Sequence, residues 1–134
     1  MFQPVDDQVL LSGQIFPANM AGIAAQGVTM IVNNRPDGEA PGQPSGAAIA
    51  AAAEAAGIGY RHIPIAGGLS QAQVEEMVGA LTASEGKVLA FCTSGTRSAY
   101  LWALARSQAG GDAEDIMRKA AGAGYDLGPI RALL

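Results

Sequence analysis

Residues 88–98 read Val-Leu-Ala-Phe-Cys-Thr-Ser-Gly-Thr-Arg-Ser, and this stretch decides the fold. Residues 88–91 are all apolar, which is typical of a strand buried on both faces of a sheet. A loop from Cys92 to Arg97 follows, and the pattern beyond it predicts a helix to about Gln108. Ligands of open α/β sheets bind at the carboxyl ends of the strands, so Cys92 is predicted to lie at the functional edge.

Short β-like runs alternate with alanine-rich helical patterns along the rest of the chain. Two further strands are predicted over 28–32 and 60–63, and helices over 17–26, 46–56, 70–84 and 112–121, with a short helix after Tyr125. Residues 9–12 and 14–16 flank Gly13 and predict a short hairpin or edge pair. This order predicts an α/β fold with a central, mostly parallel sheet flanked by helices on both faces.

The composition fits one domain over residues 1–134. Apolar residues make up 49% of the chain and charged residues 15%, which allows a packed core and argues against a disordered chain. The net charge of −4 argues against nucleic acid or an anionic membrane as a partner. We find neither a signal-peptide pattern nor an apolar run long enough to span a bilayer, so we expect a cytoplasmic protein.

Cys92 and His62 are the only cysteine and the only histidine. An intrachain disulfide therefore cannot form, and a structural zinc site would lack ligands. We expect no metal and no cofactor.

The loop after residue 91 combines a thiol with features that bind anions. Backbone N–H groups and the positive end of a helix dipole favour a thiolate at Cys92, whose pKa should be lowered. Gly95 allows a tight turn, and Arg97 adds a permanent charge with a bidentate fork. Four hydroxyl residues of the loop offer further donors to an anion: Thr93, Ser94, Thr96 and Ser98. An inert buried cysteine is the alternative, but such neighbours are poor core residues. We therefore predict that Cys92 is a nucleophile and that Arg97 acts with it.

Several motifs along the chain carry a family resemblance. Cys92–Ser98 looks like the Cys-loop-Arg motif of cysteine phosphatases and rhodanese-type sulfurtransferases. Together with this motif, the following segments resemble the phosphatase-like domain of beta-lactamase-hydrolase-like proteins: 33–39 (NNRPDGE), 41–45 (PGQPS), 63–65 (IPI), 101–103 (LWA) and 123–127 (AGYDL). The resemblance implies a fold like that of dual-specificity and tyrosine phosphatases. Such domains occur alone or fused to a persulfide dioxygenase, so a separate dioxygenase is one expected partner.

Two features distinguish a sulfurtransferase from a phosphatase: the length of the loop between Cys92 and Arg97, and the presence of a general acid. The loop has four residues between Cys92 and Arg97, the rhodanese spacing and one fewer than in tyrosine-type phosphatases. The loop 64–69 lacks the general acid that the phosphatases place there, and Phe91 stands where they usually have His. We therefore favour a sulfurtransferase that takes sulfane sulfur from thiosulfate or a low-molecular-weight persulfide through a Cys92 persulfide. The alternatives are a cysteine-dependent phosphatase with a Cys92 phosphoenzyme, and a non-catalytic anion-binding module.

Three residues outside the loop are further candidates. Arg35 follows the strand 28–32 at the same sheet edge and could bind the anionic or sulfur-bearing substrate. It could equally pair with Asp37 or Glu39 and shape its own loop. Asp37 is a candidate acid, although an Asp before Gly is usually structural, and His62 is more often a core residue than a base. Because the chain has one cysteine, the acceptor must be an external thiol. Apolar residues such as Leu133 could also form a homodimer contact.

Overall fold

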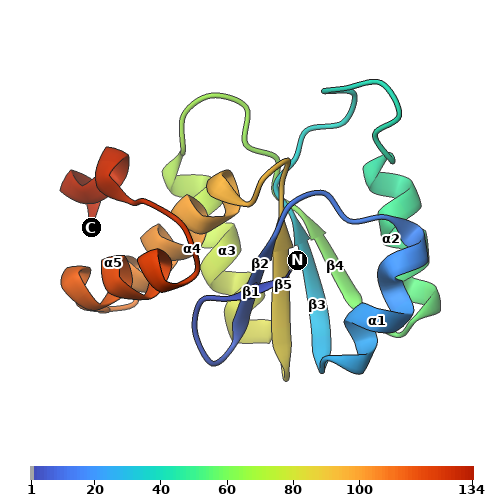
Figure 1. Ribbon diagram of the computed structural model, residues 1–134, viewed down its shortest axis with the longest axis horizontal. Helices are drawn as coiled ribbons and strands as arrows, with labels where there is room; N and C mark the ends of the chain where they lie inside the picture. Colours follow the sequence, from blue (N-terminus) through green and yellow to red (C-terminus); the bar gives the residue numbers. More distant parts are fainter. Residues whose placement is uncertain (1) are drawn as a thin grey trace.

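A parallel sheet forms the centre of the computed structural model, which describes residues 2–134. Its strands are β1 (Gln3–Pro4), β2 (Val9–Ser12), β3 (Val28–Asn33), β4 (Gly59–His62) and β5 (Lys87–Phe91). The spatial order is β1-β2-β5-β3-β4, and only the β1–β2 pair is antiparallel. The Cys-bearing strand β5 is therefore the central strand, paired on both sides (Figure 1). The predicted α/β class with a mostly parallel sheet is confirmed.

Helices cover both faces of the sheet. They are α1 (Met20–Ala25), α2 (Gly46–Ala55), α3 (Gln71–Ala83), α4 (Thr96–Gln108) and α5 (Ala113–Gly122), with 3-10 turns η1 (Pro17–Asn19) and η2 (Gly128–Leu133). Helices α1 and α2 lie on one side of the sheet, and α3, α4 and α5 on the other (Figure 1). None of the helices described in residues 2–134 is both long and apolar enough to cross a membrane.

Alternating side chains of β5 divide the core between these two faces. Leu89 and Phe91 pack with residues of α1 and α2, whereas Val88 and Ala90 pack with residues of α3 and α4. All four are fully buried. Successive residues of a strand point to opposite faces, so a strand covered on both sides must be apolar throughout.

The helices begin where the sequence places capping residues. The hydroxyls of Ser45 and Ser70 accept hydrogen bonds from the first turns of α2 and α3, and Ser70 forms a capping box with Gln73. The carboxylate of Asp112 caps α5 in the same way. Helix α4 differs, because its cap is Gly95 in the left-handed conformation, at φ 95°. The helix that carries Arg97 therefore starts inside the loop that follows Cys92 (the Cys loop, residues 92–98).

The predicted hairpin over 9–16 is wrong. Strand β2 pairs with β1 and β5, and residues 14–16 are not a strand. Instead, the Gln14 N–H donates to the Thr93 carbonyl at 3.3 Å. A Cβ on Gly13 would lie 2.8 Å from that carbonyl oxygen, so glycine is needed here for close approach rather than for a turn. This segment supports the back of the Cys loop.

Candidate active site

Cys92 lies at the carboxyl end of β5, where the strand meets the Cys loop (residues 92–98). Its own N–H donates to the Ser12 carbonyl at 3.3 Å, and its side chain is almost fully buried, at 1% exposure. The Gly95 N–H donates to Sγ at 3.1 Å. Burial by itself raises the pKa of the thiol, but backbone N–H groups at the sulfur outweigh it and lower the pKa below its ordinary value. These N–H groups belong to Ser98, Ser94, Gly95 and Arg97. The loop therefore stabilises a thiolate.

Tyr125, which is distant in sequence, leaves no space for a side chain at Gly95. A Cβ on this residue would lie 2.1 Å from the hydroxyl of Tyr125. That hydroxyl donates to the Ser94 carbonyl at 3.1 Å, so Tyr125 braces the outer side of the Cys loop. From the sequence, packing is the favoured role for Tyr125 and a hydroxyl at the rim of the pocket is the alternative, and neither predicts the bond to Ser94.

Arg97 is fixed by hydrogen bonds at both ends of its guanidinium. Nη1 and Nη2 donate to the two carboxylate oxygens of Glu39, at 2.8 and 2.9 Å. Nη1 also donates to the Ile65 carbonyl at 2.9 Å, and Nη2 donates to the Thr93 hydroxyl at 2.8 Å. The bond to Arg97 outweighs a small effect of burial and, with Arg35, lowers the pKa of Glu39 to about 2. Glu39 is thus ionised throughout the physiological range. The sequence offered it only as a partner of Arg35 and did not predict its bonds to Arg97.

Arg35 joins the same charge cluster. Its Nε donates to Glu39 at 3.0 Å and its Nη1 to the Gln14 side chain at 3.0 Å, and the residue is only 8% exposed. One carboxylate therefore holds both arginines of the predicted site. His62 Nε2 lies 2.9 Å from the Arg35 carbonyl oxygen, so the histidine contacts this loop through the backbone. The carboxylate of Asp37 accepts from the Gly46 N–H at 2.7 Å, at the start of α2.

The hydroxyls of the Cys loop have partners within the protein. Ser98 Oγ donates to the Asn34 side chain at 2.7 Å, and Asn34 Nδ2 donates to the Ile63 carbonyl at 2.9 Å. Asn34 is fully buried and is a residue that sequence reasoning missed. Ser94 Oγ and Thr96 Oγ1 lie 3.1 Å apart on the exposed side of the loop. Asn34 thus links the start of α4 to the ends of β3 and β4.

Metal-ligating side chains do not gather anywhere in the described part of the chain. Within residues 2–134, no three His, Cys, Asp or Glu side chains are placed to hold a metal ion. What this site offers instead is a stabilised thiolate in a loop with Arg97, whose carboxylate partner Glu39 also binds Arg35. Such an arrangement suits nucleophilic chemistry on an anionic substrate.

The sequence model of one protein family matches residues 2–111: "Beta-lactamase hydrolase-like protein, phosphatase-like domain". The chain belongs to this family. A beta-lactamase hydrolase-like protein of Xylella fastidiosa is 36% identical over 126 residues, or 92% of this chain. One from Agrobacterium fabrum is 37% identical over 101 residues, or 75% of the chain. The chain spans only 29% and 23% of the length of these two relatives.

The chain also resembles solved structures over nearly its whole length. A candidate phosphatase from Neisseria meningitidis is 33% identical, with a TM-score of 0.85 over 97% of this chain and 93% of that one. PTPMT1 is 15% identical, with a TM-score of 0.78 over 99% and 91% of the two chains, and this likeness concerns the fold alone. The predicted phosphatase-like fold is confirmed. The comparisons support the phosphatase alternative more directly than they support sulfur transfer.

Proposed function

We propose that this domain transfers sulfane sulfur through a persulfide on Cys92. One observation carries the proposal: the site holds a stabilised thiolate but offers no protonated acid. Among residues 2–134, Glu39 is the only acid that makes hydrogen bonds to the Cys loop, and its pKa of about 2 keeps it ionised. A leaving group that departs as an anion needs no proton, and sulfite or a thiolate is such a group.

The first step is attack of the Cys92 thiolate on the outer sulfur of thiosulfate or of an organic persulfide. A sulfur–sulfur bond forms at Cys92, the donor's sulfur–sulfur bond breaks, and its electron pair leaves with sulfite or with the thiolate. The backbone N–H groups around Sγ would then stabilise the negative terminal sulfur of the Cys92 persulfide.

The second step needs a thiolate from outside the chain, because Cys92 is the only cysteine. This thiolate attacks the terminal sulfur, leaves with it as a new persulfide, and restores the Cys92 thiolate. An enzyme that oxidises the product persulfide, such as a dioxygenase, is the partner we propose.

Intact-protein mass spectrometry after incubation with thiosulfate tests this proposal. We expect a mass gain of one sulfur atom on the wild type, its loss on adding glutathione, and no gain on Cys92→Ser. Wild type that gains no sulfur from thiosulfate or from glutathione persulfide would contradict the proposal.

Phosphoester hydrolysis through a Cys92 phosphoenzyme is the second candidate, which the match to a phosphatase-like domain family and the similarity to a candidate phosphatase favour. Release of phosphate from p-nitrophenyl phosphate measures it directly. This substrate carries a good leaving group, so it reports on the nucleophile even without a general acid. Release that depends on Cys92, without any sulfur adduct, would establish this alternative instead.

A further inference from the structure

We propose that the substrate's reacting end is carried on an apolar chain, which lies in a groove beside Arg97. The inference rests on the proposed function only in that Cys92 reacts with the anionic end of this substrate. It names the chemical class of the carrier, which the chemistry at the sulfur leaves open.

The groove starts at the guanidinium that holds the Cys loop. A cavity of about 300 Å³ opens here, and its lining is mostly apolar: Ile65, Gly67, Gly68, Leu69, Arg97, Tyr100, Ile130 and Leu133. The Ile65 carbonyl accepts from Arg97 at 2.9 Å, so the wall of the cavity is bonded to the guanidinium that also donates to the Thr93 hydroxyl of the Cys loop. Anion site and apolar cavity are thus two ends of one surface.

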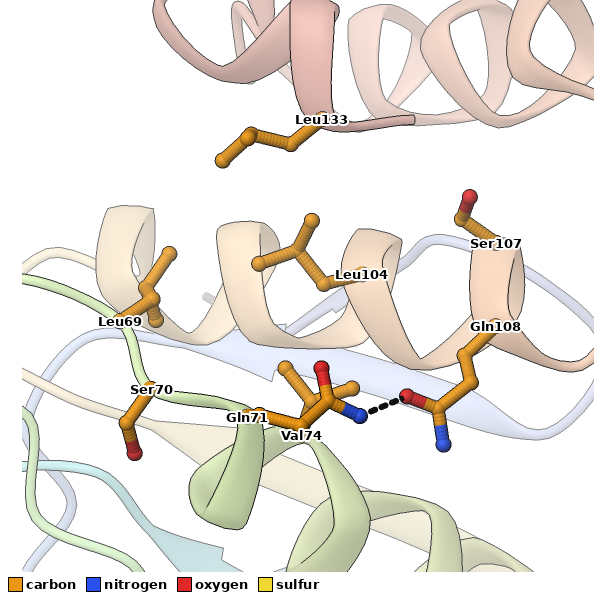
Figure 2. Close-up of a pocket in the computed structure, with 8 residues that line it drawn as sticks. All are labelled: Leu69, Ser70, Gln71, Val74, Leu104, Ser107, Gln108 and Leu133. Carbon is orange, nitrogen blue, oxygen red and sulfur yellow. Dashed lines mark hydrogen bonds between the residues drawn. The ribbon is translucent and has the colours of Figure 1, made fainter.

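A second hollow continues the groove away from the Cys loop. It has a volume of about 290 Å³ and shares Leu69 and Leu133 with the first. Figure 2 shows Leu133 opposite Leu104, with Leu69 at one end and the hydrogen-bonded pair Gln71–Gln108 at the other. Both apolar and polar side chains therefore line this second hollow.

Charge complementarity determines the class of occupant. Arg97 and Arg35 share a single carboxylate, that of Glu39, so this end of the groove keeps a net positive charge that favours an anionic or polarised head. The leucine and isoleucine walls favour a hydrocarbon body. Among residues 2–134, Leu133 is one of two large hydrophobic residues that are well exposed, at 64%, and it lies on this groove. An alkyl or aryl persulfide matches both ends, whereas inorganic thiosulfate fills only the first.

Labelling of Cys92 by alkyl methanethiosulfonates tests the groove without any turnover. The thiolate attacks the sulfur that bears the alkyl group, a mixed disulfide forms, and methanesulfinate leaves. We would compare methyl, butyl and hexyl reagents, each rate divided by the rate of the same reagent with free glutathione. Because a buried methylene contributes up to about fourfold, we expect the hexyl reagent to exceed the methyl reagent by at least about tenfold.

Two groove variants and one matched control locate the effect. Leu133→Lys and Leu69→Gln should each lower the hexyl-to-methyl ratio by about threefold or more. Phe16→Lys alters the other exposed large hydrophobic residue, at 48%, which lies outside the groove, and should leave the ratio unchanged. A normalised ratio near one in the wild type, or equal ratios in all variants, would overturn the inference. Sulfur loading from thiosulfate, measured on the same samples, reports on the proposed function separately.

Discussion

Glu39 occupies the face of Arg97 that would otherwise bind an oxyanion. Both Nη groups donate to its carboxylate, at 2.8 and 2.9 Å. Nη1 also donates to the Ile65 carbonyl, and Nη2 also donates to the Thr93 hydroxyl. A guanidinium has five N–H donors in all, so an incoming anion meets a largely occupied fork. Glu39 therefore both positions Arg97 and competes with anions for it.

Replacing Glu39 by Gln should make the site bind inorganic anions more tightly. The amide keeps the shape of the side chain but removes its negative charge. Sulfate should therefore protect Cys92 of the variant from iodoacetamide at concentrations at least about threefold lower than those needed for the wild type. The free energy of unfolding should fall by less than about 1 kcal/mol, because the Glu39–Arg97 ion pair is partly exposed. Glu54→Gln, on the exposed side of α2, is the matched control. Weaker protection by sulfate in Glu39→Gln would show that positioning outweighs competition.

The Cys92 thiol should react as a thiolate at neutral pH. Its pKa is lowered in the folded protein, so the iodoacetamide rate should stay high below the usual thiol pKa of about 8.5 and fall only as pH drops through the lowered value. The charge of Glu39 does not change in this range, because its pKa is about 2. The measurement is the labelling rate from pH 4 to about 10, with the protein unfolded in urea as reference. A midpoint equal to that of the unfolded chain would contradict the thiolate assignment.

Gly95→Ala should damage the Cys loop more than a positive φ alone explains. The residue has φ 95°, and an added Cβ would meet the Tyr125 hydroxyl at 2.1 Å. Gly124→Ala is the matched control, because its φ is 94° and its Cβ would point into open space. We expect the control to lose about 1 kcal/mol of unfolding free energy and Gly95→Ala at least about twice as much. Only Gly95→Ala should slow Cys92 labelling, and equal effects of the two changes would refute the role of Tyr125.

Asn34 and Ser98 should be energetically coupled. Asn34→Ala leaves the buried Ile63 carbonyl and the Ser98 hydroxyl without partners, which should cost about 2–3 kcal/mol of unfolding free energy. Ser98→Ala removes only one bond and should cost about 1 kcal/mol. A double-mutant cycle by urea denaturation should give a coupling of about 1 kcal/mol, and strict additivity would argue against the contact.

Asp6 should stabilise the fold in a pH-dependent way. Burial by itself raises its pKa, but hydrogen bonds from Trp102, Arg106 and two backbone N–H groups outweigh this and lower it. The contribution is therefore complete above the ordinary carboxyl pKa of about 3.9 and is lost as pH falls through the lower folded value. Asp6→Asn should lose about 2 kcal/mol at pH 7 and less than half of that at the lowest pH where the protein folds. The exposed Asp7→Asn serves as control, and a pH-independent loss for Asp6→Asn would contradict the assignment.

Local patterns predicted most elements of the fold. The apolar run 88–91 became the central strand β5, and Ser70 with Gln73 formed the expected capping box. The prediction of a hairpin around Gly13 was wrong, because a β-like run in the sequence does not show which strand it will pair with. Strand β2 found a longer partner in β5, about 80 residues away in the chain, and Gly13 met the Cys loop instead.

The sequence by itself determined the setting of the predicted nucleophile: a cysteine between a buried strand and a helix start, with Gly95 and Arg97 at fixed offsets. Those features act over a few residues, so they can be read locally. Tertiary structure alone decided which groups surround them. Glu39, Asn34 and Tyr125 reach the loop across 58, 64 and 31 residues of sequence. Asn34 and Glu39 follow the end of strand β3, whereas Tyr125 follows helix α5. A hydrogen bond between distant residues leaves no periodic pattern in the chain, because its geometry exists only once the sheet has formed.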